Sequence, residues 1–264
     1  LKMLALVLSG RDVGGAKASE VLAKKAADNT ILAASLRKAA SIPSDSILFN
    51  IDQKADVNAK KSDFDALLGV FQKVFDEHCG YYGKQAYIAQ LERDLDRRGE
   101  FAAFRAAYDR IAGKAWETGR EQALLEGGNV ARAYREITGD NDAASSDILK
   151  RYREDYRLSV ESFVMQVASF LDGQGPAYRL NFFVDEVGQY IADNVKLMTN
   201  LQTIAETLHT RCGGRSWIVV TAQQDIQSVI GDLTRREEND FSKIQARFAH
   251  RMPLNSADVA EVIQ

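Results

Sequence analysis

Three short apolar runs limit the folds that this chain can adopt. They lie at 46–52, 178–184 and 216–220, and each gives way to polar residues at or near its carboxyl end. Segments with a helical spacing of apolar residues separate them, and strands that alternate with helices predict a parallel sheet covered on both faces. A fourth candidate strand lies at 247–254. Because such sheets place their chemistry at the carboxyl ends of the strands, we expect the functional residues there.

The stretch between the first two runs contains no proline and is predicted to be helical. Apolar residues fall on one helix face within 64–75 and within 156–171. Weaker periodic segments lie between them, separated by glycines, at 87–95, 101–111 and 130–137. We therefore predict a large all-helical insertion between the strand at 46–52 and the strand at 178–184.

Two further helices are expected after the second run. Leu197, Leu201, Ile204 and Leu208 define an amphipathic helix that ends at Gly213-Gly214, a suitable C-cap. A polar helix at about 235–246 then leads to the fourth candidate strand.

Composition excludes several classes of protein. The chain has 264 residues, of which 45% are hydrophobic and 27% charged, and a formal net charge of −3, so nothing marks the whole chain as a dedicated nucleic-acid binder. The longest apolar run is the six residues 3–8, far below the roughly 18 that a membrane span needs. We expect no signal peptide and no membrane partner. The two cysteines, Cys79 and Cys212, form no CxxC pair, which favours a reducing compartment.

An acidic pair, Asp185-Glu186, follows the second apolar run, in the form of a Walker B element. An Asp on rigid backbone can hold the Mg²⁺ of a bound nucleotide, and the adjacent carboxylate can polarise an attacking water. The pair is therefore a candidate for ATP and magnesium chemistry. An apolar run followed by Asp-Glu also occurs where a strand simply turns into a solvated loop.

The next apolar run ends in Thr221 and Gln223, which are candidates to contact the γ-phosphate or to position water. Arg247 and Arg251 flank the fourth candidate strand. An Arg that enters this strand from a polar helix is a candidate finger for the nucleotide of a neighbouring subunit, and Arg251 is a candidate nucleotide-binding residue. The alternatives are strand and helix caps for the first pair and surface arginines for the second.

The phosphate-binding loop pattern GxxxxGK[ST] is absent. The nearest candidate is 10–19, where Ala16 occupies the Lys position after Gly15 and Lys17 is followed by Ala. This segment lacks the residues that would cradle phosphates.

Four segments together resemble the large P-loop ATPase of BREX phage-resistance systems, the BrxC/PglY family. They are NFFVDEVGQYI at 181–191, NLQTI at 200–204, WIVVTAQQD at 217–225 and FSKIQARF at 241–248. The resemblance covers most of the chain and is strongest from 179 to 264. It implies that residues 1–4 continue the helix after a phosphate-binding loop, so that the chain is a fragment cut just downstream of its Walker A motif. The run at 3–8 would then be helix, despite its strand-like composition.

The resemblance implies an α/β fold of the P-loop NTPase class, similar to AAA+ and ASCE ATPases. Residues 1–59 and 173–256 would form the two parts of the ATPase core, 60–172 the helical insertion, and 257–264 the start of a lid region. Asp185 becomes the magnesium-associated acid, Glu186 the catalytic carboxylate, Gln223 with Thr221 the sensor, and Arg247 the finger acting between subunits.

The family also implies partners and a location. The implied partners are further copies of the chain in a homo-oligomer, a companion methyltransferase, a phosphatase-like protein and DNA. The implied location is the bacterial cytoplasm. The fragment itself is expected to be inactive without the phosphate-binding loop. A different function remains open, in which the fold has lost catalysis and serves as a scaffold whose helical insertion docks partners.

Overall fold

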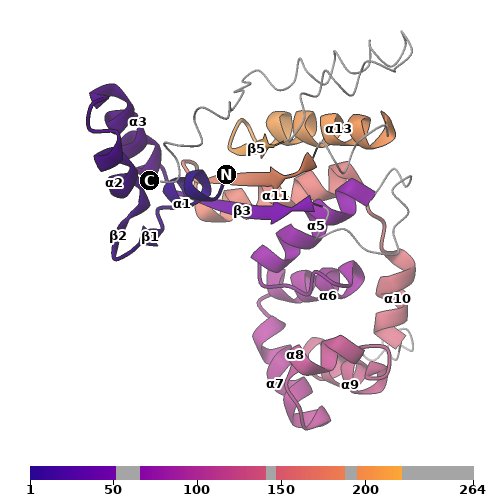
Figure 1. Ribbon diagram of the computed structural model, residues 1–264. Coiled ribbons are helices and arrows are strands. Elements are labelled where there is room, and N and C mark those ends of the chain that lie inside the picture. The colour runs from indigo at the N-terminus through magenta and orange to yellow at the C-terminus, as the bar shows by residue number, and fades with distance from the viewer. Residues whose placement is uncertain (52–65, 141–146, 188–194, 222–264) are drawn as a thin grey trace.

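The computed structural model describes residues 1–51, 66–140, 147–187 and 195–221. Its centre is a parallel sheet in the order β3–β4–β5, formed by β3 (Ser44–Asn50), β4 (Arg179–Asp185) and β5 (Ser216–Val220) (Figure 1). The predicted α/β fold with a parallel sheet is confirmed at this level. The helix expected at 235–246 and the strand expected at 247–254 lie outside the described residues.

The pairing register aligns the carboxyl ends of the strands. Asn50 lies opposite Asp185, and Val184 lies opposite Val220. The sheet edge that the sequence marks as functional is therefore formed by all three strands.

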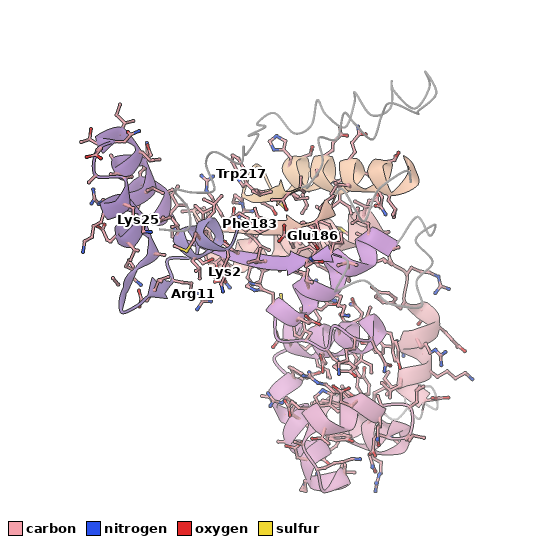
Figure 2. The ribbon with its side chains drawn as sticks, viewed as in Figure 1. Lys2, Arg11, Lys25, Phe183, Glu186 and Trp217 are labelled. Carbon is pink, nitrogen blue, oxygen red and sulfur yellow. The ribbon has the colours of Figure 1, made fainter. Side chains whose placement is uncertain are left out.

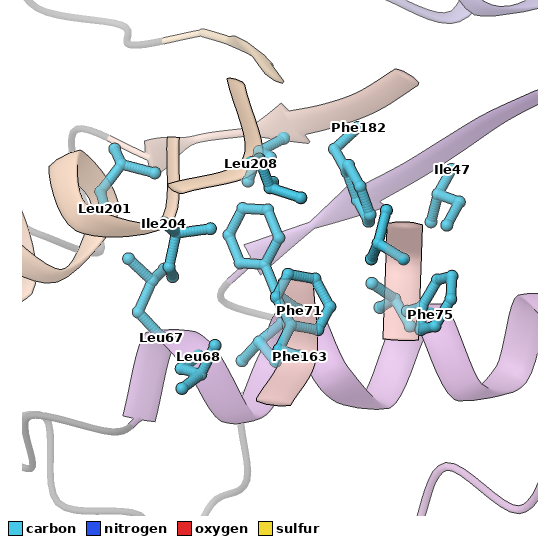
Figure 3. Packing of buried hydrophobic residues seen from close by; sticks show 14 of the residues in the cluster. Ile47, Leu67, Leu68, Phe71, Phe75, Phe163, Phe182, Leu201, Ile204 and Leu208 are labelled. Carbon is cyan, nitrogen blue, oxygen red and sulfur yellow. The ribbon is translucent and has the colours of Figure 1, made fainter. Parts of the chain in front are cut away.

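One face of the sheet packs against three helices, α5 (Ala66–His78), α11 (Val160–Gln174) and α13 (Val195–Arg211) (Figure 3). Alternate strand residues such as Ile47, Phe49 and Phe182 point into this core. The ring of Phe71 on α5 lies 5.5 Å from both Phe49 and Phe182, measured between centroids. This aromatic packing fixes the strands that carry the candidate site.

Two predicted helix features are confirmed. Residues 3–8 lie in helix α1 (Lys2–Leu8), whose end is held where the Ser44 hydroxyl donates to the Leu8 carbonyl oxygen. Helix α13 ends as the glycine pair predicts: Gly213 has φ +58°, and the Gly214 N–H donates to the His209 carbonyl oxygen over 3.2 Å. This is the Schellman arrangement, which needs a left-handed residue after the helix.

A second apolar core lies among the helices after α5, on one side of the sheet in Figure 1. The elements of this helical cluster are α6 (Ala86–Arg97), α7 (Phe101–Ala112), α8 (Trp116–Gly119), the 3₁₀ turn η1 (Arg120–Gln122), α9 (Gly127–Thr138) and α10 (Ile148–Asp155). The predicted segments at 87–95, 101–111 and 130–137 are α6, α7 and α9. Helices α5 and α11, by contrast, belong to the core of the sheet. The division of the chain into domains stays a prediction.

An N-terminal hairpin precedes the sheet. It comprises β1 (Asp12–Val13) and β2 (Ala16–Lys17), and two helices, α2 (Ala18–Lys25) and α3 (Thr30–Ala40), follow it. Gly14 and Gly15 form the tight turn between β1 and β2, with φ +60° and +83°, values that glycine adopts without strain. Among the described residues, no helix combines the length and apolar character needed to cross a membrane.

Candidate functional site at the strand ends

The candidate site is formed where the three strands end. Strand β4 delivers Asp185 and then Glu186, β3 ends at Asn50, and Thr221 follows β5 directly. Figure 2 shows Glu186 at this end of the sheet. Phe182, Phe183 and Val184 are fully buried, whereas Asp185 and Glu186 are partly exposed. A rigid buried strand thus holds two carboxylates at the protein surface.

Thr221 binds both acidic residues. Its hydroxyl donates to Asp185 Oδ1 and accepts a hydrogen bond of 3.3 Å from the Glu186 backbone N–H. Its own backbone is held by two further bonds of 3.0 Å, from the Thr221 N–H to the Val184 carbonyl and from the Val187 N–H to the Thr221 carbonyl. Thr221 therefore fixes the position of the Asp185 carboxylate relative to β5.

Asn50 binds the other carboxylate. Its side-chain amide donates to Glu186 Oε2. Glu186 has φ +61° and is the one non-glycine residue with a positive φ in the part of the chain that the structure describes. A left-handed conformation costs a residue with a Cβ atom roughly 1–2 kcal/mol. Such strain at a polar surface position is typical of functional sites.

The donor set fits a hydrated magnesium ion. Mg²⁺ prefers oxygen ligands and commonly uses one or two carboxylates together with water and substrate phosphates. The Asp185 carboxylate, oriented by Thr221, supplies oxygen of this kind beside Glu186. Within the described ranges, no group of three or more His, Cys, Asp or Glu side chains forms a metal site made of protein alone.

The structure brings together three of the residues selected from the sequence, Asp185, Glu186 and Thr221. Gln223, Arg247 and Arg251 lie outside the described residues. The sequence analysis did not select Asn50. One sequence signal could have identified Asn50. It is a polar residue near the end of an apolar run, and that run is predicted to be a strand of the same sheet as the run that carries the acidic pair.

The glycine-rich segment at 10–19 forms the β1–β2 hairpin and the start of α2. Lys17 Nζ donates to the Gly10 carbonyl oxygen and pairs with Asp12 within the same hairpin. Comparison with known proteins adds no assignment: no protein-family model matches this chain, and no solved structure matches it significantly.

Proposed function

We propose that this chain is part of the core of a magnesium-dependent ATPase of the BREX phage-defence type. The observation that carries the proposal is the meeting of Asp185, Glu186, Thr221 and Asn50 at one edge of a parallel sheet. Parallel sheets bind their ligands at this edge. The four sequence segments that resemble the BREX ATPase include β4 and β5, which deliver three of these residues.

Each residue has a distinct role in this proposal. Asp185 holds the metal of the metal–nucleotide complex, and Thr221 orients the Asp185 carboxylate. Glu186 orients the attacking water and accepts its proton. Bound Mg²⁺ would neutralise charge on the β- and γ-phosphates. Because hydrolysis of this kind depends mainly on positioning and electrostatics, the hydrogen bonds that fix the two carboxylates are part of the catalytic machinery.

Asn50 is a positioning residue in this scheme. Its amide holds one oxygen of the Glu186 carboxylate and so sets the plane of the group that must face the water. An amide suits this role because it donates a hydrogen bond to the ionised carboxylate without adding charge. A second acid at this position would repel Glu186.

The orientation of α1 supports the same reading. Leu8, the last residue of α1, accepts a hydrogen bond from Ser44, the first residue of β3, and so the last turn of α1 lies at the edge of the sheet opposite the site. A helix that follows a phosphate-binding loop at the carboxyl edge would run in this direction. The resemblance implies such a loop, with its amides and Lys, before α1.

Nucleotide binding tests the proposal in the protein extended through that loop. Calorimetric titration with ATP should show binding that depends on Mg²⁺, and Asp185→Asn should weaken the Mg²⁺ dependence. The matched control is Asp155→Asn, which alters an exposed carboxylate on α10 that pairs with Arg151. Absence of ATP binding by the wild-type protein would refute the proposal. Binding without turnover would favour the non-catalytic scaffold.

A further inference from the structure

Helix α3 presents a face suited to contact with another helix. Ile31 is 79% exposed, and a shallow groove beside it is lined by Thr30, Ala34, Ser35 and Lys38. Asn29 caps the helix, since its side chain accepts a hydrogen bond of 3.0 Å from the Leu32 N–H. Small residues next to a protruding apolar one let a second helix approach closely.

The surroundings of this face are basic. Residues 1–43 contain seven Lys and Arg against three Asp and Glu, a formal charge of +4. The other 221 residues contain 27 against 34, a formal charge of −7. Lys24 and Lys25 lie in the last turn of α2, which packs against α3, and both are exposed. Figure 2 shows Lys25 on α2, away from Glu186. This surface therefore complements an acidic partner.

The outer face of α11 has the complementary properties. Glu161, Met165, Ser169 and Asp172 are exposed, and their spacing of four, four and three residues places them on one side of the helix. Met165 is 62% exposed, whereas Phe163 and Val167 on the opposite side are buried in the core of the sheet. The α11 face thus has an apolar centre between two acidic residues, of which Asp172 also pairs with Arg215 in the same copy.

We propose that the exposed face of α3 binds the exposed face of α11 in a second copy of this chain. The contact brings Ile31 of one copy to Met165 of the next, with lysines of α2 and α3 facing Glu161 and Asp172. Because two different surfaces meet, a pair of copies leaves one α3 face and one α11 face free for further copies, and the assembly is a ring or an open chain. The inference stands on charge and exposure and does not depend on ATP chemistry.

Sedimentation velocity over a range of protein concentrations tests the contact with the full chain. We expect the wild-type chain to self-associate, and to do so less as salt is raised. Lys38→Glu and Glu161→Lys should each weaken self-association by about tenfold or more, because each places like charges opposite one another. Leu125→Asp is the control, since Leu125 is 84% exposed and lies on the helical cluster, outside the proposed contact.

Mixing the two charge-reversal variants gives the sharpest result. In the mixture, the reversed α3 face of one variant meets the reversed α11 face of the other, and the remaining faces are unchanged. Association should therefore return to near the wild-type level. A monomeric wild-type chain would overturn the proposal. It would also be overturned if the reversals had no more effect than Leu125→Asp, or if the mixture failed to restore association.

Discussion

The side-chain amide of Asn50 donates a hydrogen bond to the Glu186 carboxylate and joins the ends of β3 and β4 across 136 positions of sequence. Phe49, one residue before Asn50, packs in the core against Phe71. The amide is therefore anchored by a strand whose position the core determines. Glu186 lies beyond the end of β4, in a strained conformation, and depends on its hydrogen bonds for its orientation.

Replacing Asn50 should impair catalysis more than binding. In the protein extended upstream through the proposed phosphate-binding loop, Asn50→Ala should lower kcat for ATP hydrolysis by about 10- to 100-fold, because a misplaced catalytic group costs rate of this order. The dissociation constant for ATP should change little. Asn181→Ala is the control: it also removes an Asn from the sheet, but one whose amide donates to the Asp45 carbonyl oxygen. Equal losses from both variants would indicate a general loss of structure.

Substitution of Thr221 tests the hydrogen bonds that join the end of β5 to the acidic pair. Thr221→Val keeps the shape of the side chain but removes the hydroxyl, which donates to Asp185 and accepts from the Glu186 N–H. We expect a loss of about 1–2 kcal/mol in the free energy of unfolding and a higher Mg²⁺ concentration for half-maximal turnover. Thr221→Ser, which keeps the hydroxyl, should behave like the wild type. A wild-type Mg²⁺ requirement in Thr221→Val would contradict the role given to this hydroxyl.

The conformation of Glu186 predicts an unusual order of stability. Glu186→Gly and Glu186→Ala both remove the contact with Asn50, but only glycine relieves the strain of φ +61°. Glu186→Gly should therefore be more stable than Glu186→Ala by about 1 kcal/mol in chemical denaturation. At positions with negative φ, a glycine variant is normally less stable than the alanine variant. If alanine gave the more stable protein, Glu186 would not hold a left-handed conformation.

Asp76 predicts a pH dependence of stability that is separate from the site. Asp76 on α5 is fully buried, forms an ion pair with Arg93 of α6 and accepts a hydrogen bond of 2.8 Å from Gln72. Burial raises the pKa of Asp76 from 3.8 to about 6, although Arg93 and Gln72 act in the opposite direction. The folded state therefore binds a proton that the unfolded state releases between these two values. The stability contributed by this proton is present at pH 4 and is lost as the pH rises through about 6.

The variant Asp76→Asn removes this titration. The difference in free energy of unfolding, wild type minus variant, should be larger at pH 4 than at pH 7, whatever the absolute cost of leaving Arg93 without its carboxylate partner. Chemical denaturation curves of both proteins between pH 4 and pH 7 measure this difference. Asp155→Asn, at a side chain that is 76% exposed, is the control. A difference that grows with pH would show that the Arg93 charge, rather than burial, dominates.

The sheet and its acidic edge could be predicted because apolar strands and amphipathic helices leave periodic patterns. The strand that carries Asp185 is buried on both faces from Leu180 to Val184, as expected of a central parallel strand. The glycine pair after α13 marked its end. The composition of residues 3–8 alone predicts a strand, and only the resemblance predicted helix α1.

Other features could not be predicted because they depend on contacts between distant residues. Helix α3 has Ala33 as its one buried residue, so its apolar pattern is too weak to stand out. The contact between Asn50 and Glu186 depends on the register of β3 against β4, which no local pattern contains. The strained φ of Glu186 likewise follows from the turn after β4 and the bonds to Thr221.

Turnover by Glu186→Gln tests the central claim most directly. In the protein extended upstream through the proposed phosphate-binding loop, the wild type should hydrolyse ATP only with Mg²⁺. Glu186→Gln should bind ATP as tightly as the wild type and turn it over about a hundredfold more slowly, or slower still, because the amide cannot accept the proton of the attacking water. Turnover at the wild-type rate in Glu186→Gln would contradict the assignment of Glu186 as the catalytic carboxylate.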